Sequence, residues 1–165
     1  MAESRALAQL AELVGDTLHK RSLMVATAES CTAGLVSAAI TDISGASAWF
    51  ERGFVTYSNE AKSQMLGVPA TLIREHGAVS EPVAHAMAEG AVLNSRAQVA
   101  LAVTGVAGPT GGTPTNPSAW CASAGATACR RGETRHFKGD RKQIRLQAAE
   151  HALRGLLDFL DAAES

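Results

Sequence analysis

The stretch LMVATAESCTAGLVSAAIT (residues 23–41) joins an apolar run to a segment of small and aliphatic residues. Its first part, Leu23–Ala28, is the kind of short apolar run that forms a buried β-strand. The second part, Ser30–Thr41, is typical of a helix that packs through small side chains, and serine is a preferred residue at a helix N-cap. The stretch therefore predicts a strand that leads directly into a helix, with Ser30 at the junction.

The segments on either side continue this alternation of helices and strands. Such alternation predicts an α/β fold, and the absence of a helix between the last two strand candidates allows antiparallel pairing there. We expect a single three-layer α/β/α domain over residues 1–165, with a mostly buried mixed sheet. The predicted helices are 3–20, 58–66, 80–96 and one that begins with a capping-box pattern at 140–143; the predicted strands are 53–57, 98–103, 119–129 and 134–137.

Charge and composition exclude several classes of protein. The chain has 15 Lys and Arg against 16 Asp and Glu, a formal net charge of -1, whereas proteins that bind nucleic acids usually carry a large cationic surplus. Aromatic residues make up 4% of the chain, with Tyr57 the single tyrosine, which argues against a stacking platform for bases. The longest stretch without Asp, Glu, Lys or Arg, residues 97–129, is interrupted by glycines and prolines, so it predicts no membrane helix.

The cysteines and histidines indicate neither a disulfide framework nor a metal site. Cys31, Cys121 and Cys129 are odd in number and form no CxxC pair, and the five histidines show no zinc-ligand spacing. The N-terminus carries no secretory signal pattern. We therefore expect a cytoplasmic protein in a reducing compartment, without a metal or another cofactor.

Ser30 is the first candidate for chemistry. A serine at a strand-to-helix junction lies near the unpaired N–H groups of the first helical turn, which can stabilise an oxyanion or a phosphate. The surrounding sequence is neither a GxSxG elbow nor a P-loop. Two interpretations stay open: Ser30 is a nucleophile, or it only caps the helix. Cys31 is a rival nucleophile, but as a free cysteine without a neighbouring His it is typical of a packed small residue.

Tyr57 and Lys62 form the second candidate. If Ser58 caps the following helix, these two residues occupy the N′ and N4 positions, which meet in a hydrophobic staple. A partly buried lysine at the positive end of a helix has its ammonium form disfavoured, so its pKa falls towards the range useful for a base. The alternative is a solvated surface lysine beside a staple tyrosine.

Two further segments favour an anionic ligand. The glycine-rich loop that starts at Thr104-Gly105 and includes Gly108 follows a buried strand, and ligands bind outside the carboxyl ends of strands in open α/β sheets. Arg141 and Arg145 stand four residues apart at the start of the last helix, where cations run against the helix dipole unless an anion is bound. A basic face that pairs with carboxylates elsewhere explains the same arginines.

Several long strings in the chain resemble one known family. They are TAESCTAG (27–34), GASAWFERGFVTYSNEAK (45–62), HGAVSEPV (76–83), TGVAGPTGG (104–112) and GDR (139–141), and together they span most of the chain. These strings strongly resemble the CinA C-terminal domain family, whose stand-alone bacterial members are nicotinamide-nucleotide amidohydrolases.

The resemblance implies hydrolysis of the carboxamide of nicotinamide mononucleotide to nicotinate mononucleotide and ammonia. The family's Ser–Lys–Tyr arrangement falls on Ser30, Lys62 and Tyr57. Ser30 would then attack the amide, and Lys62 would accept its proton directly or through the Tyr57 hydroxyl. Helix N–H groups near Ser30, or the Gly105–Gly108 loop, would hold the oxyanion. The expected substrate contacts are Glu29, Cys31, Thr32, Asn59, Thr104, Gly105 and Gly108, with Arg141 and Arg145 for the 5′-phosphate.

One departure from the family pattern keeps other functions open. Family members usually continue the glycine loop into a segment like PVGTV, whereas Pro117-Ser118-Ala119-Trp120 stands here and residues 121–125 have low strand propensity. A nucleotide-binding or regulatory module without turnover, associated with competence or DNA damage, is the second hypothesis, and an oligomeric scaffold with alanine-rich helix faces is the third. As partners we expect a small-molecule nucleotide and further copies of the chain, with no nucleic acid and no membrane.

Overall fold

The computed structural model describes residues 2–106, 118–123, 131–134 and 137–162. Its centre is a five-stranded sheet in the order β2-β1-β3-β4-β5, in which β2, β1 and β3 run parallel and β4 and β5 are antiparallel to their neighbours. The predicted mixed sheet is therefore confirmed. The strands are β1 Val25–Glu29, β2 Phe50–Val55, β3 Val99–Thr104, β4 Ser118–Ser123 and β5 Arg131–Thr134.

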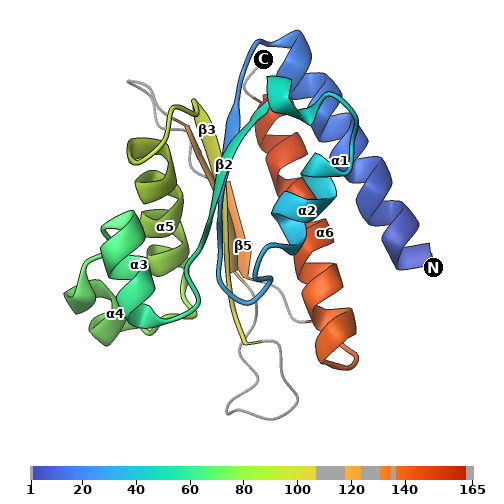
Figure 1. Cartoon of the computed structure of the whole chain (residues 1–165). Helices are drawn as coiled ribbons and strands as arrows, with labels where there is room; N and C mark the ends of the chain where they lie inside the picture. The colour runs from blue at the N-terminus through green and yellow to red at the C-terminus, as the bar shows by residue number, and fades with distance from the viewer. Residues whose placement is uncertain (1, 107–117, 124–130, 135–136, 163–165) are drawn as a thin grey trace.

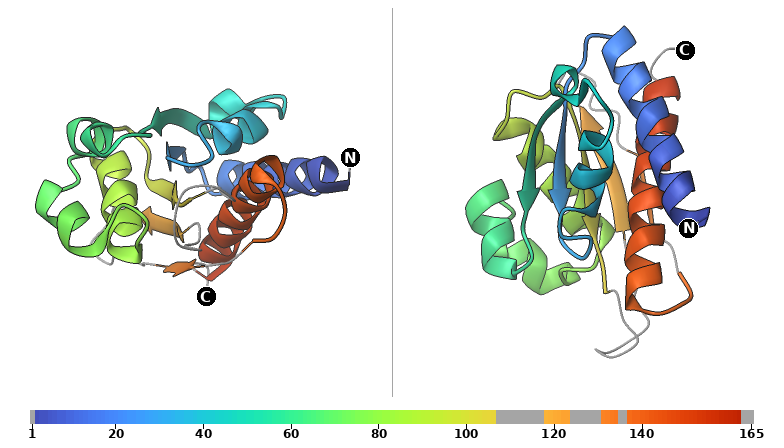
Figure 2. Two further views of the ribbon diagram at one scale, coloured as in Figure 1. Left: turned by 90° about the horizontal axis from the view of Figure 1, so that it is seen from below. Right: turned by 45° about the vertical axis from the view of Figure 1, so that its right-hand side comes forward.

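Helices cover both faces of this sheet and give the predicted three layers (Figure 1). One face carries α1 (Ala2–Lys20), α2 (Leu35–Thr41) and α6 (Arg141–Ala162), and the other carries α3 (Asn59–Leu66), α4 (Ala70–His76) and α5 (Glu81–Leu93). A short 3₁₀ helix, Ala46–Ala48, precedes β2. The two views in Figure 2 show α1 and α6 lying side by side on their face of the sheet. Within the described residues, no helix has the length and apolar character of a membrane span.

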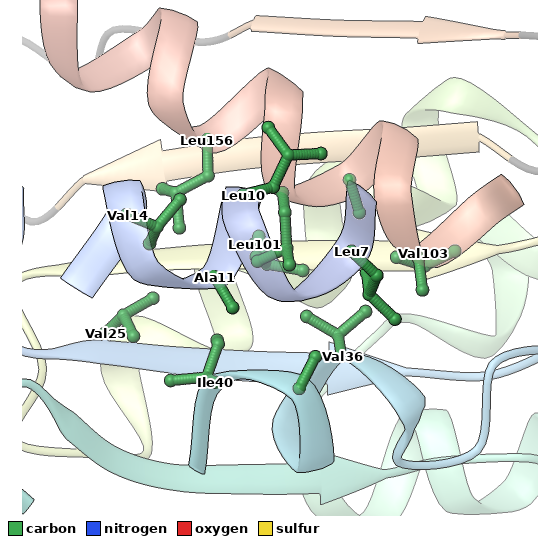
Figure 3. Close-up of a cluster of buried hydrophobic side chains, with 14 of the residues drawn as sticks. Leu7, Leu10, Ala11, Val14, Val25, Val36, Ile40, Leu101, Val103 and Leu156 are labelled. Atoms are coloured by element: carbon green, nitrogen blue, oxygen red, sulfur yellow. The ribbon is translucent and has the colours of Figure 1, made fainter. Parts of the chain in front are cut away.

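The sheet separates two hydrophobic cores. On the α1 side, Val25 of β1 and Leu101 of β3 pack beneath the α1 and α6 side chains, including Val14 and Leu156 (Figure 3). On the other side the same strands present alanines, which meet Met87 and its neighbours on α5. The alternation follows from the two-residue period of a strand. Small side chains on one face let α5 lie close to the sheet. The alanines are Ala26, Ala28, Ala100 and Ala102.

Several capping predictions are confirmed by the structure. The Ser58 side chain accepts a hydrogen bond from the Ala61 N–H at 3.0 Å, and Gly67 ends α3 at φ +68°. At the start of α6, the Gln143 N–H donates to the Asp140 carboxylate and the Asp140 N–H donates to the Gln143 amide oxygen, both at 2.8 Å. This reciprocal pair is the predicted capping box.

The predicted start of the second helix is wrong. Helix α2 begins at Leu35, with Gly34 at φ +102° as its N-cap, so Ser30 lies in a turn and does not cap the helix. The reason is Glu29, whose carboxylate takes the role of a cap, as described below. The short helix α4 (Ala70–His76) was not predicted, because seven residues after Pro69 carry too little periodicity for a helix to be recognised.

Gly90 supplies a test of how closely α5 packs against α3. A Cβ at this position would strike the backbone carbonyl of Leu66 at the end of α3. We expect Gly90→Ala to lower the free energy of unfolding by about 1–3 kcal/mol, because the clash is with backbone that cannot rotate away. Urea denaturation monitored by circular dichroism measures the change.

The matched control is Gly155→Ala in α6, where a Cβ meets nothing within 4 Å. There we expect a gain of roughly 0.5–1 kcal/mol, because alanine restricts the unfolded chain more than glycine does. Equal effects of the two substitutions would contradict close packing of α5 on α3.

Candidate active site

The carboxyl ends of β1, β2 and β3 meet at one edge of the sheet, which is the lower edge in Figure 1. Ser30 follows β1, and its N–H donates to the Val103 carbonyl at 2.9 Å. Thr56 follows β2, and its N–H donates to the Glu29 carbonyl at 2.9 Å. Strand pairing therefore continues into these residues and fixes the backbone on both sides of the site.

The Lys62 amine lies against the Ser30 hydroxyl inside the protein. Lys62 Nζ is 3.2 Å from Ser30 Oγ, and it also donates to the carbonyls of Thr56 at 3.1 Å and Tyr57 at 3.2 Å. Lys62 is 1% exposed and Ser30 is 6% exposed. A carbonyl can only accept hydrogen bonds, so the two carbonyls occupy two N–H groups. A neutral amine has two N–H groups and one lone pair, so its lone pair is left to accept a hydrogen bond from the Ser30 hydroxyl.

Burial lowers the pKa of Lys62 below that of an ordinary lysine, and the proximity of Cys31 offsets only part of this effect. The physical cause is desolvation, because the ammonium form loses the water that would stabilise its charge. No ion pair of Lys62 with a carboxylate is found in the described part of the chain. This arrangement favours the neutral amine that a proton acceptor needs, and the surface-lysine interpretation is wrong.

Cys31 is a poor alternative nucleophile. Its side chain is buried, and burial raises the pKa of the Cys31 thiol to about 11. The thiolate is the reactive form of cysteine, so this thiol is almost entirely in its unreactive form near neutral pH. The described geometry therefore favours Ser30 over Cys31 as the nucleophile.

Glu29 organises the turn that carries Ser30. One oxygen of its buried carboxylate accepts from the Thr32 hydroxyl at 2.7 Å and the Val36 N–H at 2.9 Å. The other accepts from the Ser37 N–H at 3.0 Å and the Ser37 hydroxyl at 2.6 Å. All four bonds stay within the protein, so in this conformation the carboxylate holds the turn and α2 together. Its predicted contact with substrate stays a prediction.

The same bonds remove one expected source of oxyanion donors. The Leu35 N–H donates to the Thr32 carbonyl at 3.1 Å, and the next two N–H groups of α2 donate to Glu29. Leu35, Val36 and Ser37 at the start of α2 therefore have no N–H group left for an oxyanion. The expectation of an N–H donor near Ser30 stays a prediction. Donors near Ser30 would have to come from the turn itself or from the segment after β3.

Tyr57 meets Lys62 through its backbone and not through its ring. The Tyr57 carbonyl accepts from Lys62, whereas its side chain is 60% exposed and its hydroxyl accepts from Arg141 Nη2 at 3.2 Å. The Lys62 amine points into the interior to reach Ser30, whereas the Tyr57 hydroxyl contacts Arg141. Tyr57 and Arg141 lie on the exposed side of the site.

Arg145, the second predicted phosphate ligand, contacts the turn of residues 30–34 between β1 and α2, called the Ser30 turn below. Its Nε donates to the Cys31 carbonyl at 2.9 Å and its Nη2 donates to the Thr32 carbonyl at 3.2 Å. The guanidinium is half-buried, unlike the exposed Arg141 one helical turn earlier. Helix α6 is thus tied to the turn that carries the candidate nucleophile.

The other predicted contact residues are more dispersed. Asn59 lines a cavity of about 330 Å³ between α3 and α4, and Ser30 does not line it. The buried Thr104 hydroxyl donates to the Ala78 carbonyl at 2.8 Å, and half-buried Gly105 follows at the end of β3. Gly108 lies outside the described residues. Within those residues, no group of three His, Cys, Asp or Glu side chains is arranged to hold a metal ion.

Sequence reasoning missed Thr56 and Ser37. Thr56 supplies a carbonyl to Lys62, and its buried hydroxyl has no hydrogen-bond partner among the described residues. A buried hydroxyl in that state is suited to holding a water molecule. The sequence held no signal for Thr56, because the predicted strand 53–57 includes it, whereas β2 ends at Val55. Ser37, which holds Glu29, had no signal because small polar residues are common on helices.

Comparisons with known proteins identify the family of this chain. The model of the CinA C-terminal domain matches residues 7–160. The chain is 53% identical over 152 residues to the nicotinamide-nucleotide amidohydrolase PncC of Escherichia coli (strain K12), covering 91% of this chain and 92% of that protein. It is 47% identical to the PncC of Pseudomonas putida, covering 91% and 94%.

A solved structure shows the same fold. The crystal structure of the competence/damage inducible protein CihA from Agrobacterium tumefaciens matches with a TM-score of 0.86 and 39% identity, over 94% of this chain and 96% of that one. Identities of this size over nearly whole chains place this protein among the amidohydrolases. The chain belongs to the CinA C-terminal domain family.

Proposed function

We propose that this protein hydrolyses the carboxamide of nicotinamide mononucleotide, giving nicotinate mononucleotide and ammonia, with Ser30 as the nucleophile. The observation that carries the proposal is the buried contact of 3.2 Å between Lys62 Nζ and Ser30 Oγ. A serine becomes a useful nucleophile when a base is within hydrogen-bond reach. The substrate class is supported by the names of relatives that share about half of their residues with this chain.

The reaction would proceed through an ester of Ser30. Ser30 Oγ attacks the carboxamide carbon while neutral Lys62 takes the hydroxyl proton. Lys62 then returns that proton to the amide nitrogen, the C–N bond breaks, and ammonia leaves. Water attacks the resulting ester with Lys62 again as the base, which releases the carboxylate and restores the Ser30 hydroxyl. The Thr56 and Tyr57 carbonyls hold the amine in place through both steps.

The exposed side of the site is suited to the nucleotide's phosphate. Arg141 lies on the exposed first turn of α6, in contact with the Tyr57 hydroxyl. Arginine binds phosphate through charge-assisted hydrogen bonds, and the N-terminus of a helix adds a favourable dipole. We assign the 5′-phosphate to Arg141, with the exposed Tyr57 as its neighbour.

Replacement of the nucleophile is the most direct test. We expect Ser30→Ala to lower kcat at least about 10³-fold, because Ser30 carries the hydroxyl that lies against Lys62. Ammonia release from nicotinamide mononucleotide, coupled to a dehydrogenase assay, measures the rate. Ser95→Ala, at the opposite edge of the sheet after α5, is the control and should keep full activity. Undiminished turnover by Ser30→Ala would rule out the serine mechanism.

The pH dependence tests the role of Lys62. Because burial lowers the pKa of Lys62, its neutral form should accumulate at pH values below 10.5, the ordinary pKa of lysine. We therefore expect kcat/KM to rise with pH along a limb whose midpoint is below 10.5, and a profile from about pH 6 to 10 measures it. Lys62→Arg, which cannot lose its proton in this range, should be inactive throughout. A flat profile would contradict a lysine base.

A further inference from the structure

The Ser30 turn has a conformation that must be held by its surroundings. Ala33 has φ +46° and Gly34 has φ +102°, and the left-handed region is unfavourable for a residue with a Cβ. Inside the turn, the Ala33 N–H donates to the Ser30 carbonyl at 3.1 Å. Non-glycine residues keep such a conformation only where neighbouring groups fix it. Two charged side chains do so here.

Glu29 holds the turn as a hydrogen-bond acceptor, and Arg145 holds it as a hydrogen-bond donor. Glu29 accepts hydrogen bonds from donors of the turn and α2, namely Thr32, Val36 and Ser37. Arg145 donates to two carbonyls that α2 does not fully satisfy, those of Cys31 and Thr32. Arginine presents its N–H groups in a rigid planar fork, so two bonds from one guanidinium fix both position and orientation.

The contact with the Cys31 carbonyl has a further geometric consequence. In a planar trans peptide the C=O and the following N–H point in opposite directions. With the Cys31 carbonyl held towards Arg145, the Thr32 N–H faces away from α6. No hydrogen bond of that N–H is found in the described part of the chain. A charge-assisted bond at the carbonyl also polarises the peptide and strengthens the N–H as a donor.

We propose that Arg145 is a positioning residue that holds the Ser30 turn and orients the Thr32 N–H as an oxyanion donor, and that it does not bind the phosphate. This inference rests on the proposed function, because it concerns the nucleophile of that reaction. It gives the two arginines of α6 different roles: Arg141 binds substrate, and Arg145 positions the groups that react. Lysine has no planar fork, so it cannot replace Arg145 in full.

Steady-state kinetics of Arg145→Ala separate positioning from phosphate binding. We expect kcat to fall about 10²-fold, the cost of a misplaced reacting group, while KM for nicotinamide mononucleotide changes little. Arg145→Lys should retain intermediate activity, and millimolar guanidinium should restore part of the kcat of Arg145→Ala. The matched control is Arg154→Ala, which removes an exposed arginine of the same helix and should leave both parameters unchanged. A rise in KM with unchanged kcat would overturn the inference in favour of a phosphate contact.

A measurement without substrate keeps this inference separate from the proposed function. Hydrogen exchange followed by mass spectrometry should show faster exchange of the peptide that covers residues 30–37 in Arg145→Ala, with α1 and α5 unchanged. If the unmodified protein releases no ammonia, the proposed function fails and exchange alone decides whether Arg145 holds the turn. Unchanged exchange at residues 30–37 would overturn the inference whatever the activity.

Discussion

The site depends on one buried hydrogen bond, that between Lys62 and Ser30. Burying an amine costs free energy in its charged form, and no ion pair with a carboxylate offsets that cost among the described residues. The protein satisfies the amine with two backbone carbonyls, from Thr56 and Tyr57. Carbonyls stabilise an N–H donor without adding a negative charge that would raise the pKa again. Burial therefore lowers the pKa of Lys62, and the two carbonyls hold its N–H groups without a charge that would cancel this effect.

The second constraint is the geometry of the strand-to-helix connection. A carboxylate at the N-terminus of a helix is favourable, and Glu29 uses that position to join the end of β1 to the start of α2. Gly53 of the neighbouring strand belongs to the same arrangement. A Cβ there would lie 2.7 Å from both the Ser37 and Thr27 hydroxyls, which are themselves 2.7 Å apart. The hydrogen-bonded Thr27 and Ser37 hydroxyls thus leave no room for a Cβ on β2, which links two strands to the start of α2.

The sequence predicted the α/β layers and the pairing of Ser30 with Lys62 because both depend on local patterns and on a family resemblance. Periodicity identified α1 and α6, and the capping residues Ser58 and Gly67 identified α3. The order of strands and helices brought residues after β1 and β2 to one edge. The prediction of the second helix failed because a different residue caps it. Ser30 has the residue type of an N-cap, but the Glu29 carboxylate accepts the N–H groups of α2 from the preceding strand. Spacing also placed Arg145 one helical turn after Arg141, but it could not show that the Cys31 and Thr32 carbonyls lie opposite Arg145.

Packing between the layers supports the direct contacts that hold Lys62 beside Ser30. Lys62 is carried by α3, which touches the sheet layer through α5, whereas Ser30 is carried by β1. Helix α5 approaches β1 and β3 over alanines, and it approaches α3 at Gly90, where even a methyl group would strike the Leu66 carbonyl. Closely packed interiors do not absorb displacements gradually. The small residues of α5 and the sheet therefore hold α3, which carries Lys62, close to β1, which leads into Ser30.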